Sequence, residues 1–512
     1  MYPGTHAFLT PDKPAIIMQA TGQHVTYAQL EDRSLRLANW LRSIGLKRGD
    51  VIALISDNDA RVFDVYWAAQ RAGLYITAVN YRLRPDELRY ILENSGSKAL
   101  FAGHCSEEAT EGWKDLPELV HRVTFDTVRP GFLALEQVIA GASDTRPEQE
   151  PQGGDMLFSS GTTGRPKGVR QALPERAVSE PGDTMVALFG GVFGFSSETV
   201  YLCPAPLYHA APLRTCAAVH ALGGTTIIMD KFDPEAALQA IEQWRVNAAQ
   251  WVPTMFVRML KLPEEVRSRY DVSNLRIAIH AAAPCPVEVK RAMMEWWGPI
   301  LYEYYSCTEL NGMTVVGPQE WLRKPGSVGK PVLGKLHICD DGGVELPIGR
   351  DGLVYFERDT LPFNYHGDPE KTRSTQHPHH SNWTAVGDIG HVDADGYLYL
   401  TDRSAFMIIS GGVNIYPQEV ENALTLHPAI ADVAVIGVPD AEMGEQVKAV
   451  VTLAPGQEPS DELAQAIIEF AKSQVASYKA PKSVDFVPVL PRTPTGKMLK
   501  GEVRKRYWPI RA

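Results

Sequence analysis

The chain alternates between two patterns of hydrophobic and polar residues. Thr26 and Gln29 have the spacing of a capping box, and apolar residues then recur at helical spacing as far as Ile44. The apolar run 51–55 instead predicts a buried strand. The alternation returns further along, with helices expected at 63–72 and 234–244 and strands at 225–229 and 275–279. This order predicts an α/β fold with layered, largely parallel sheets.

A second unit is expected beyond Asp402. Its patterns predict helices at 417–426 and 461–478 and strands at 433–438, 448–453 and 484–489. The basic run 500–506 is typical of a solvated tail. A chain of 512 residues is too long for one simple core. We therefore predict a large N-terminal domain of several subdomains, residues 1–402, and a small α+β domain, residues 403–512.

Charge and cysteine usage narrow the class of protein. The net charge of −11 argues against a nucleic-acid binder, although local charge still decides whether a phosphate ligand binds. The six cysteines are scattered and none forms a Cys-x-x-Cys pair, which suits a reducing compartment. No signal-peptide pattern and no apolar run of about 18 residues is visible, so a cytoplasmic protein without a membrane span is expected.

The stretch 158–169, Phe-Ser-Ser-Gly-Thr-Thr-Gly-Arg-Pro-Lys-Gly-Val, carries the strongest chemical signal. Its glycines let backbone N–H groups form an anion-binding nest, its hydroxyls add donors, and its lysine adds a positive charge. The spacing differs from that of a Walker loop. We predict that it binds a polyphosphate through Ser159, Ser160, Gly161, Thr162, Thr163, Gly164 and Lys167.

This loop resembles the phosphate-binding signature of the adenylate-forming (AMP-binding) superfamily, in particular its acyl- and aryl-CoA synthetase branch. Five further segments match family positions in the same order, so the resemblance covers nearly the whole chain. It implies ATP, Mg²⁺ and coenzyme A as co-substrates, and a small C-terminal domain that is mobile.

The segment 305–309, Tyr-Ser-Cys-Thr-Glu, is similar to the family's Tyr-Gly-x-Thr-Glu. The resemblance implies that Tyr305 packs on adenine, Thr308 touches the α-phosphate and Glu309 helps to hold Mg²⁺. An aromatic face suits adenine, and carboxylate oxygen suits a hard cation. Ser306 stands where the family usually has glycine, at the border of the acyl pocket.

The remaining segments lie towards the C-terminus. The resemblance implies that Asp388 accepts hydrogen bonds from the ribose hydroxyls and that Arg403 reaches the ribose or phosphates. Lys497 would bridge carboxylate and α-phosphate during adenylation. The paired glycines Gly411 and Gly412 match the loop that lines the coenzyme A tunnel. Ala405 replaces the family's usual hinge Asp or Lys, which leaves the rate and pivot of domain rotation open.

The acyl pocket is predicted by position in the family. The segment 282–284 (Ala282, Ala283, Pro284) resembles backbone that lies between adenine and the acyl group. His209 is taken both as a pocket residue and as a candidate catalytic residue. No lysine or arginine stands out within the matching pieces, which favours a fatty, aryl or alicyclic acid. The predicted pocket residues are His209, Ala210, Trp251, Ala281, Ser306 and Met313.

The predicted function is therefore that of an ATP-dependent acyl-CoA synthetase, an acid–thiol ligase that releases AMP and pyrophosphate. Its partners would be a small-molecule carboxylic acid and coenzyme A, without nucleic acid, and a homodimer is left open. Two alternatives stay open, an adenylating enzyme that loads a carrier protein and a non-catalytic nucleotide sensor, and a luciferase-type oxygenase has no positive support. The histidines at 377, 379 and 380 are expected in a surface loop rather than in a metal site.

Overall fold

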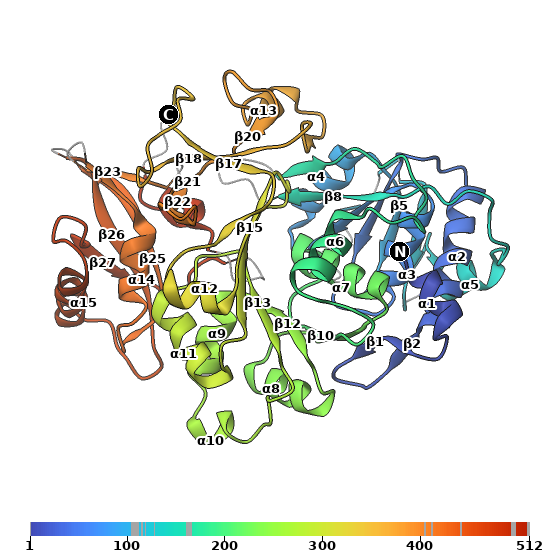
Figure 1. Cartoon of the computed structure of the whole chain (residues 1–512), viewed down its shortest axis with the longest axis horizontal. Coiled ribbons are helices and arrows are strands. Elements are labelled where there is room, and N and C mark those ends of the chain that lie inside the picture. The colour runs from blue at the N-terminus through green and yellow to red at the C-terminus, as the bar shows by residue number, and fades with distance from the viewer. Residues whose placement is uncertain are drawn as a thin grey trace.

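The structure of the chain, a computed structural model, describes residues 2–508 apart from a few short segments. The segments outside the described residues are 104–111, 114–115, 118, 127–128, 160–165, 404–405, 411–412, 441–442 and 493–497. The side chains of Asp402, Arg403 and Asn414 are also outside the description. Within the described residues the strands form four sheets, two large and two small (Figure 1).

The first large sheet has nine strands. It is parallel in its centre, from β14 to β1, and antiparallel at both edges. In spatial order its strands are β16 (Lys330–Leu333), β15 (Met313–Val316), β14 (Leu301–Tyr305), β13 (Ile277–His280), β12 (Ala248–Trp251), β10 (Val200–Cys203), β11 (Thr225–Ile228), β1 (Pro14–Met18) and β2 (His24–Thr26).

The second large sheet has eight strands. It is parallel from β8 to β7, and β8, β9 and β19 form an antiparallel edge. Its strands in spatial order are β19 (Asn364–Tyr365), β9 (Lys167–Arg170), β8 (Gly154–Ser159), β4 (Tyr75–Val79), β3 (Val51–Ile55), β5 (Ser97–Ala102), β6 (His121–Thr124) and β7 (Leu133–Ala134).

The largest core cluster lies between these two sheets, because it takes buried side chains from strands of both and from the helices between them. Those helices are α2 (Tyr27–Ser43), α3 (Val62–Arg71), α5 (Leu135–Gly141), α6 (Thr184–Val192) and α7 (Ala210–Leu222), with α1 (Pro3–Leu9) beside them. A second cluster joins the nine-stranded sheet to α8 (Pro234–Gln243), α9 (Pro253–Leu260) and α11 (Val287–Trp297). A further cluster joins the eight-stranded sheet to α4 (Pro85–Ser95). Helices and sheets therefore alternate in layers, and both sheets are covered by helices.

The two smaller sheets follow in the sequence. One is formed by β17 (Lys335–Cys339), β18 (Gly352–Glu357), β21 (Asp388–Val392) and β22 (Leu398–Arg403), with β20 (Trp383–Thr384) paired to β18. The other is formed by β24 (Val413–Ile415), β23 (Ile408–Ser410), β26 (Gly444–Leu453), β25 (Ile430–Asp440) and β27 (Ser483–Phe486). Helices α14 (Pro417–Leu424), α15 (Asp461–Gln474) and α16 (Lys500–Lys505) accompany the last sheet. In Figure 1, β23, β25, β26, β27, α14 and α15 belong to the orange and red unit at the left.

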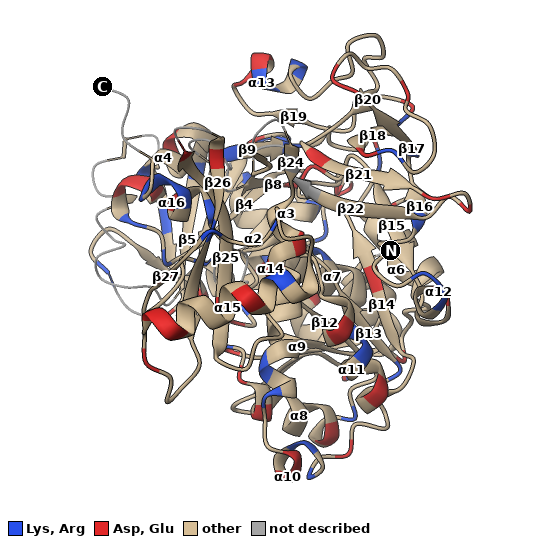
Figure 2. Ribbon diagram, turned by 90° about the vertical axis from the view of Figure 1, so that its left-hand side faces the viewer, with Lys and Arg blue, Asp and Glu red and all other residues tan. Residues whose placement is uncertain are grey.

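Three short helices complete the described structure, α10 (Glu264–Arg267), α12 (Pro318–Arg323) and α13 (Pro369–Arg373). Figure 2 shows acidic and basic residues close together on helices such as α4 and α13. None of the helices in the described part of the chain combines the length and apolar character that a membrane crossing requires. The five cysteines within the described residues are free thiols.

The predicted α/β fold, with a large and a small part, is confirmed. The capping box is present, since the Gln29 amide donates to the Thr26 hydroxyl at 3.2 Å and the Thr26 amide donates to the Gln29 side chain at 2.9 Å. The strand expected at 275–279 lies instead at Ile277–His280, and the helix expected to reach residue 478 ends at Gln474. The domain boundary at residue 402 stays a prediction.

The prediction about the tail is wrong, and the prediction about the histidine loop is confirmed only in part. The run at 500–506 is not a solvated tail: it contains α16, and the buried Lys500 ammonium lies 3.0 Å from the Glu421 carboxylate. His379 and His380 are exposed, as the surface-loop prediction expects, but His377 is 4% exposed and packs among aromatic rings that include Tyr355 and Trp383. Lys500 and His377 are buried partly by residues outside their own segments, such as Glu421 and Tyr355, and local sequence does not show such partners.

Candidate active site

The strands on either side of the predicted phosphate loop pair with each other. β8 and β9 are antiparallel, and Ser159 lies opposite Lys167 at the end of the pair that the loop connects. The loop residues predicted between them (Ser160, Gly161, Thr162, Thr163 and Gly164) lie outside the described residues. The pairing therefore brings the hydroxyl and the lysine at the two ends of the loop to one edge of the eight-stranded sheet.

Tyr365 connects this edge to the predicted magnesium ligand. β19 pairs with β9, and the Lys167 ammonium lies 5.5 Å from the centre of the Tyr365 ring. The Tyr365 hydroxyl donates to the Glu309 carboxylate at 2.8 Å. Burial and the like charge of Lys371 lower the pKa of Lys167, while Glu309 acts in the opposite direction. Sequence reasoning missed Tyr365, because its isolated Asn-Tyr strand has no distinctive pattern.

The segment that carries Thr308 and Glu309 follows the end of β14. Glu309 is buried and Thr308 is half-buried. Burial, and to a lesser degree Glu309, raises the pKa of Cys307 well above its ordinary value, so this thiol is a poor nucleophile at neutral pH. The Ser306 hydroxyl donates to the Gly312 carbonyl at 2.7 Å. That bond gives the serine in the family's glycine position a local structural role.

Backbone strain is concentrated at this site. Among the described residues, three that are not glycine have a positive φ, namely Arg245, Ala282 and Leu310. Leu310, at +51°, directly follows Glu309, and Ala282, at +73°, belongs to the segment predicted beside adenine. Strained conformations of this kind are typical of functional sites, where the surrounding structure holds them in place.

The predicted ribose-binding carboxylate lies beside the predicted adenine-binding ring. The Tyr305 hydroxyl donates to Asp388 at 2.7 Å, and the Tyr305 ring lies 6.2 Å from the Phe356 ring. Asp388 begins β21 and pairs in register with Arg403 on β22. The sequence placed these three residues at one site but did not reveal the bond between Tyr305 and Asp388. That bond orients the carboxylate without a ligand.

The residues predicted to line the acyl pocket lie at the ends of strands and helices. His209 is the N-cap residue of α7, Ala210 begins that helix, and the His209 ring lies 4.6 Å from the Tyr208 ring. Ala281 follows β13, and its amide donates to the Trp251 carbonyl at 3.3 Å. Met313 begins β15 and is buried.

The Trp251 side chain lies in the core, and Ala281 and Met313 are also buried. Trp251 is 1% exposed, and its ring packs against Phe256 and Trp297 in the second core cluster. Its backbone carbonyl, rather than its side chain, faces the Ala281 segment. By contrast, Ala282 and Pro284 are exposed and Ala283 is half-buried, so this segment is accessible to a ligand.

Four other predicted residues are not placed by the structure. Ala405, Gly411, Gly412 and Lys497 lie outside the described residues. The strands next to the glycine pair are described: β23 and β24 form a hairpin in which Ser410 pairs with Val413. Within the described residues, no group of three or more His, Cys, Asp or Glu side chains is arranged to hold a metal ion by itself.

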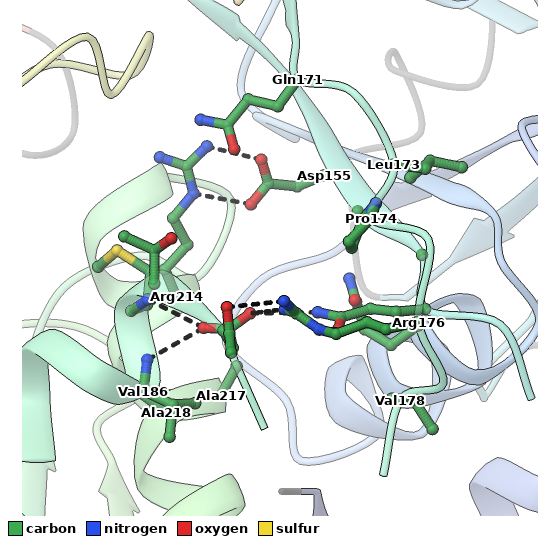
Figure 3. Close-up of a pocket in the computed structure, with 18 of the residues that line it drawn as sticks. Asp155, Gln171, Leu173, Pro174, Arg176, Val178, Val186, Arg214, Ala217 and Ala218 are labelled. Carbon is green, nitrogen blue, oxygen red and sulfur yellow. Dashed lines mark hydrogen bonds and ion pairs between the residues drawn. The ribbon is translucent and has the colours of Figure 1, made fainter. Parts of the chain in front are cut away.

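One strong interaction near the site was absent from the sequence reasoning. Arg214, on α7, makes two hydrogen bonds to the Asp155 carboxylate of β8, at 2.7 Å from Nε and 2.6 Å from Nη2. Its Nη1 donates to the Thr308 carbonyl at 3.3 Å. The pair borders a cavity of about 230 Å³ that none of the predicted acyl-pocket residues lines (Figure 3).

Comparison with known proteins agrees with this geometry. The family model described as "AMP-binding enzyme" matches residues 5–365, and the model described as "AMP-binding enzyme C-terminal domain" matches residues 419–497. The first match alone covers more than half of the chain. This chain belongs to the AMP-binding enzyme family.

Relatives match along nearly the full length. The chain is 35% identical to a feruloyl-CoA synthase of Amycolatopsis sp, over 99% of this chain and 98% of that protein. It is 32% identical to a long-chain-fatty-acid–CoA ligase of Mycobacterium tuberculosis, over 98% of this chain and 97% of that protein. The solved structure of an anthranilate CoA ligase in complex with anthranoyl-AMP is 26% identical, with a TM-score of 0.84, and the alignment covers 99% of this chain and 96% of that one.

Proposed function

We propose that the enzyme activates an apolar carboxylic acid at the site formed by β8, β9 and the segment 305–309. It is an acyl-CoA synthetase of the AMP-forming type. In the first step the carboxylate attacks the α-phosphorus of ATP, which gives an acyl-adenylate and pyrophosphate. In the second step the thiol of coenzyme A attacks the acyl carbon, which gives the thioester and AMP.

One observation carries the residue assignment. Side chains from four distant segments are linked by direct contacts: Lys167 lies over Tyr365, Tyr365 donates to Glu309, and Tyr305, four residues before Glu309, donates to Asp388. The Lys167 cation suits the phosphates and the buried Glu309 carboxylate suits Mg²⁺. The Tyr305 ring suits adenine, and the Asp388 carboxylate suits the ribose. This arrangement supports a nucleotide site rather than unrelated surface residues.

Each residue has a role that its chemistry allows. Ser159, Lys167 and the loop between them bind the β- and γ-phosphates. Thr308 contacts the α-phosphate and Glu309 holds Mg²⁺, because buried carboxylate oxygen is a preferred ligand of this ion. Asp388 accepts from the ribose hydroxyls, with Arg403 on the neighbouring strand nearby. Ala282, Ala283 and Pro284 lie between adenine and the acyl group.

The small domain supplies the residues that change between the two steps. Lys497 stabilises the charge that develops on the α-phosphorus during adenylation. Rotation about the region of Ala405 then withdraws Lys497 and presents Gly411 and Gly412 to the pantetheine arm. In this proposal the large domain spans residues 1–402 and the small domain residues 403–512. A cytoplasmic location and a homodimer stay predictions.

The acid is apolar in this proposal. Ala210, Ala281 and Met313 have aliphatic side chains, and the Tyr208 ring lies beside His209. The names of the two relatives reported above refer to feruloyl-CoA and to long-chain fatty acids. We therefore expect an aryl-substituted or fatty acid rather than an amino acid.

The experiment that tests this function is a screen of acids. Purified protein with MgATP and coenzyme A is offered fatty, aryl, cinnamic, alicyclic and amino acids, and release of AMP and pyrophosphate is measured for each. We expect AMP release that depends on both coenzyme A and an apolar acid. Turnover of amino acids without coenzyme A would replace this function with carrier loading, and ATP binding without turnover of any acid would replace it with nucleotide sensing.

Replacement of Lys497 by alanine separates the two steps. We expect Lys497→Ala to slow acid-dependent pyrophosphate release about 100-fold or more, because a cation that stabilises the transition state is lost. Thioester formation from supplied acyl-adenylate should persist. The exposed Lys505 in α16 provides the matched control, and Lys505→Ala should leave both steps unchanged. Equal losses in both steps of Lys497→Ala would remove the proposed role.

A further inference from the structure

Arg214 connects three elements that border the proposed nucleotide site. It lies on α7, Asp155 lies on β8, and Thr308 lies in the segment after β14. Figure 3 shows the guanidinium facing the Asp155 carboxylate, with two of the dashed lines joining them. Their side chains are 8% and 10% exposed. Burial alone lowers the pKa of Arg214, but the Asp155 carboxylate raises it overall, so the arginine is charged.

The geometry of the guanidinium group gives the contact its direction. A planar guanidinium can hold a carboxylate with two parallel hydrogen bonds and still present a further N–H in a fixed position. Here Nε and Nη2 hold Asp155, and Nη1 donates to the Thr308 carbonyl at 3.3 Å. The orientation of this peptide group therefore depends on the ion pair.

Both partners of Arg214 lead directly to predicted phosphate ligands. Asp155 lies four residues before Ser159 on the same strand, so the two side chains leave the same face of β8. Thr308 is itself a predicted α-phosphate contact, and Glu309 follows it. One side chain thus fixes the spacing between the start of the phosphate loop and the segment that holds the α-phosphate and Mg²⁺.

We propose that Arg214 is a positioning residue for MgATP, which it aligns by holding β8 and the Thr308 carbonyl at a fixed separation. This inference rests on the proposed function. Arg214 itself does not touch the nucleotide. Its removal is expected to weaken productive binding of MgATP while the affinity for the acid is retained.

A second arginine on the same cavity provides a matched control. Arg176 donates to the Gln152 side chain at 2.7 Å and to the Gly182 carbonyl at 2.7 Å, and it lies within 4.0 Å of Asp183. It lines the cavity together with Arg214, but these three partners lie away from the phosphate segments. Arg176 and Arg214 therefore share the cavity but differ in what they hold.

The test uses the conservative variant Arg214→Lys. A lysine ammonium can pair with Asp155 but lacks the rigid fork that also reaches Thr308. We expect thermal stability close to that of the wild type and a KM for ATP raised about 10-fold or more, with the KM for the acid unchanged. Arg176→Lys should leave both KM values at the wild-type level. An unchanged ATP KM in Arg214→Lys would overturn the proposal.

A double variant separates positioning from folding. Arg214→Met with Asp155→Leu removes both charges, so no unpaired charge stays buried and the variant should fold. We expect its ATP KM to stay raised even though its stability recovers relative to Arg214→Met alone. Recovery of both stability and ATP KM would assign Arg214 to packing only. Absence of acid-dependent pyrophosphate release in the wild type would instead count against the proposed function.

Discussion

Two buried ion pairs of the large domain have different roles. Arg214–Asp155 joins α7 to β8 through two hydrogen bonds, whereas Lys290–Glu303 joins α11 to β14 through one bond of 2.7 Å. Both pairs are shielded from water, and Lys290 is 0% exposed. Burial alone therefore does not distinguish them.

The two pairs differ in the further residues that they contact. Arg214 extends to the Thr308 carbonyl, within the proposed nucleotide site. Beside Lys290–Glu303, the His280 imidazole lies 3.4 Å from the Glu303 carboxylate, and the Lys290 ammonium lies 4.8 Å from the centre of the Trp321 ring. His280 ends β13, so this second pair supports the strand behind the Ala281–Pro284 segment from within the core. We infer that the first pair aligns the site, whereas the second stabilises β13 and β14, the strands that lead into the site segments.

Replacement of Lys290 tests the stabilising pair and has the largest expected effect. Lys290→Met leaves the Glu303 carboxylate without its cation, and burial already raises the pKa of Glu303. We expect a loss of about 3–5 kcal/mol in the free energy of unfolding, measured by urea denaturation. The ATP KM of the remaining folded enzyme should equal that of the wild type, in contrast to Arg214→Lys.

The control for this experiment is the double variant Lys290→Met with Glu303→Leu, which should recover most of the lost stability. A raised ATP KM in this stable double variant would contradict the contrast, because both pairs would then align the site. A stability of Lys290→Met equal to that of the wild type would show that the pair does not stabilise β13 and β14.

Much of the fold could be predicted from the sequence, because the signals are local. The capping box at Thr26, the apolar strand 51–55 and the helix that begins at Pro417 depend on neighbouring residues alone, and all three are present. The burial of Lys500 was missed because it depends on Glu421, far away in the sequence. Periodicity records which face of an element is apolar, but it does not record the distant partner of a charged residue.

The site was predictable to a similar extent. The segments around Ser159, Tyr305 and Asp388 have recognisable motifs, and the structure brings Tyr305 and Asp388 within hydrogen-bond distance. Arg214 and Tyr365 were missed, because each acts through a partner more than 50 residues away and neither stands in a motif. Such positioning residues become visible only when packing brings separate strands and helices together.

The second prediction concerns the pH dependence of the Lys290–Glu303 region. Burial and the nearby Lys290 ammonium hold the pKa of His280 well below 6.5, so the folded state keeps this imidazole neutral. The unfolded chain binds the proton below about pH 6.5, and stability is therefore lost as the pH falls below that value.

His280→Asn removes this titration. We expect the slope of unfolding free energy against pH between 7 and 5 to become shallower by at most about 1.4 kcal/mol per pH unit. His220 provides the control, because it lies on α7, away from this pair. Burial lowers the pKa of His220 to about 3, so this residue contributes the same kind of slope of unfolding free energy against pH. An unchanged slope in His280→Asn would show that His280 is protonated or exposed in the folded state.

The smallest expected effect lies on the nucleotide side of the comparison. Tyr365→Phe removes the hydroxyl that donates to the Glu309 carboxylate at 2.8 Å but keeps the ring beside Lys167. A lost hydrogen bond of this kind costs about 1 kcal/mol, so the Mg²⁺ concentration for half-maximal activity should rise about fivefold. Tyr355→Phe is the matched control, because Tyr355 lies on β18 and packs against His377 rather than against Glu309. If the Mg²⁺ requirement of Tyr365→Phe equals that of the wild type, contacts other than the Tyr365 hydroxyl orient Glu309.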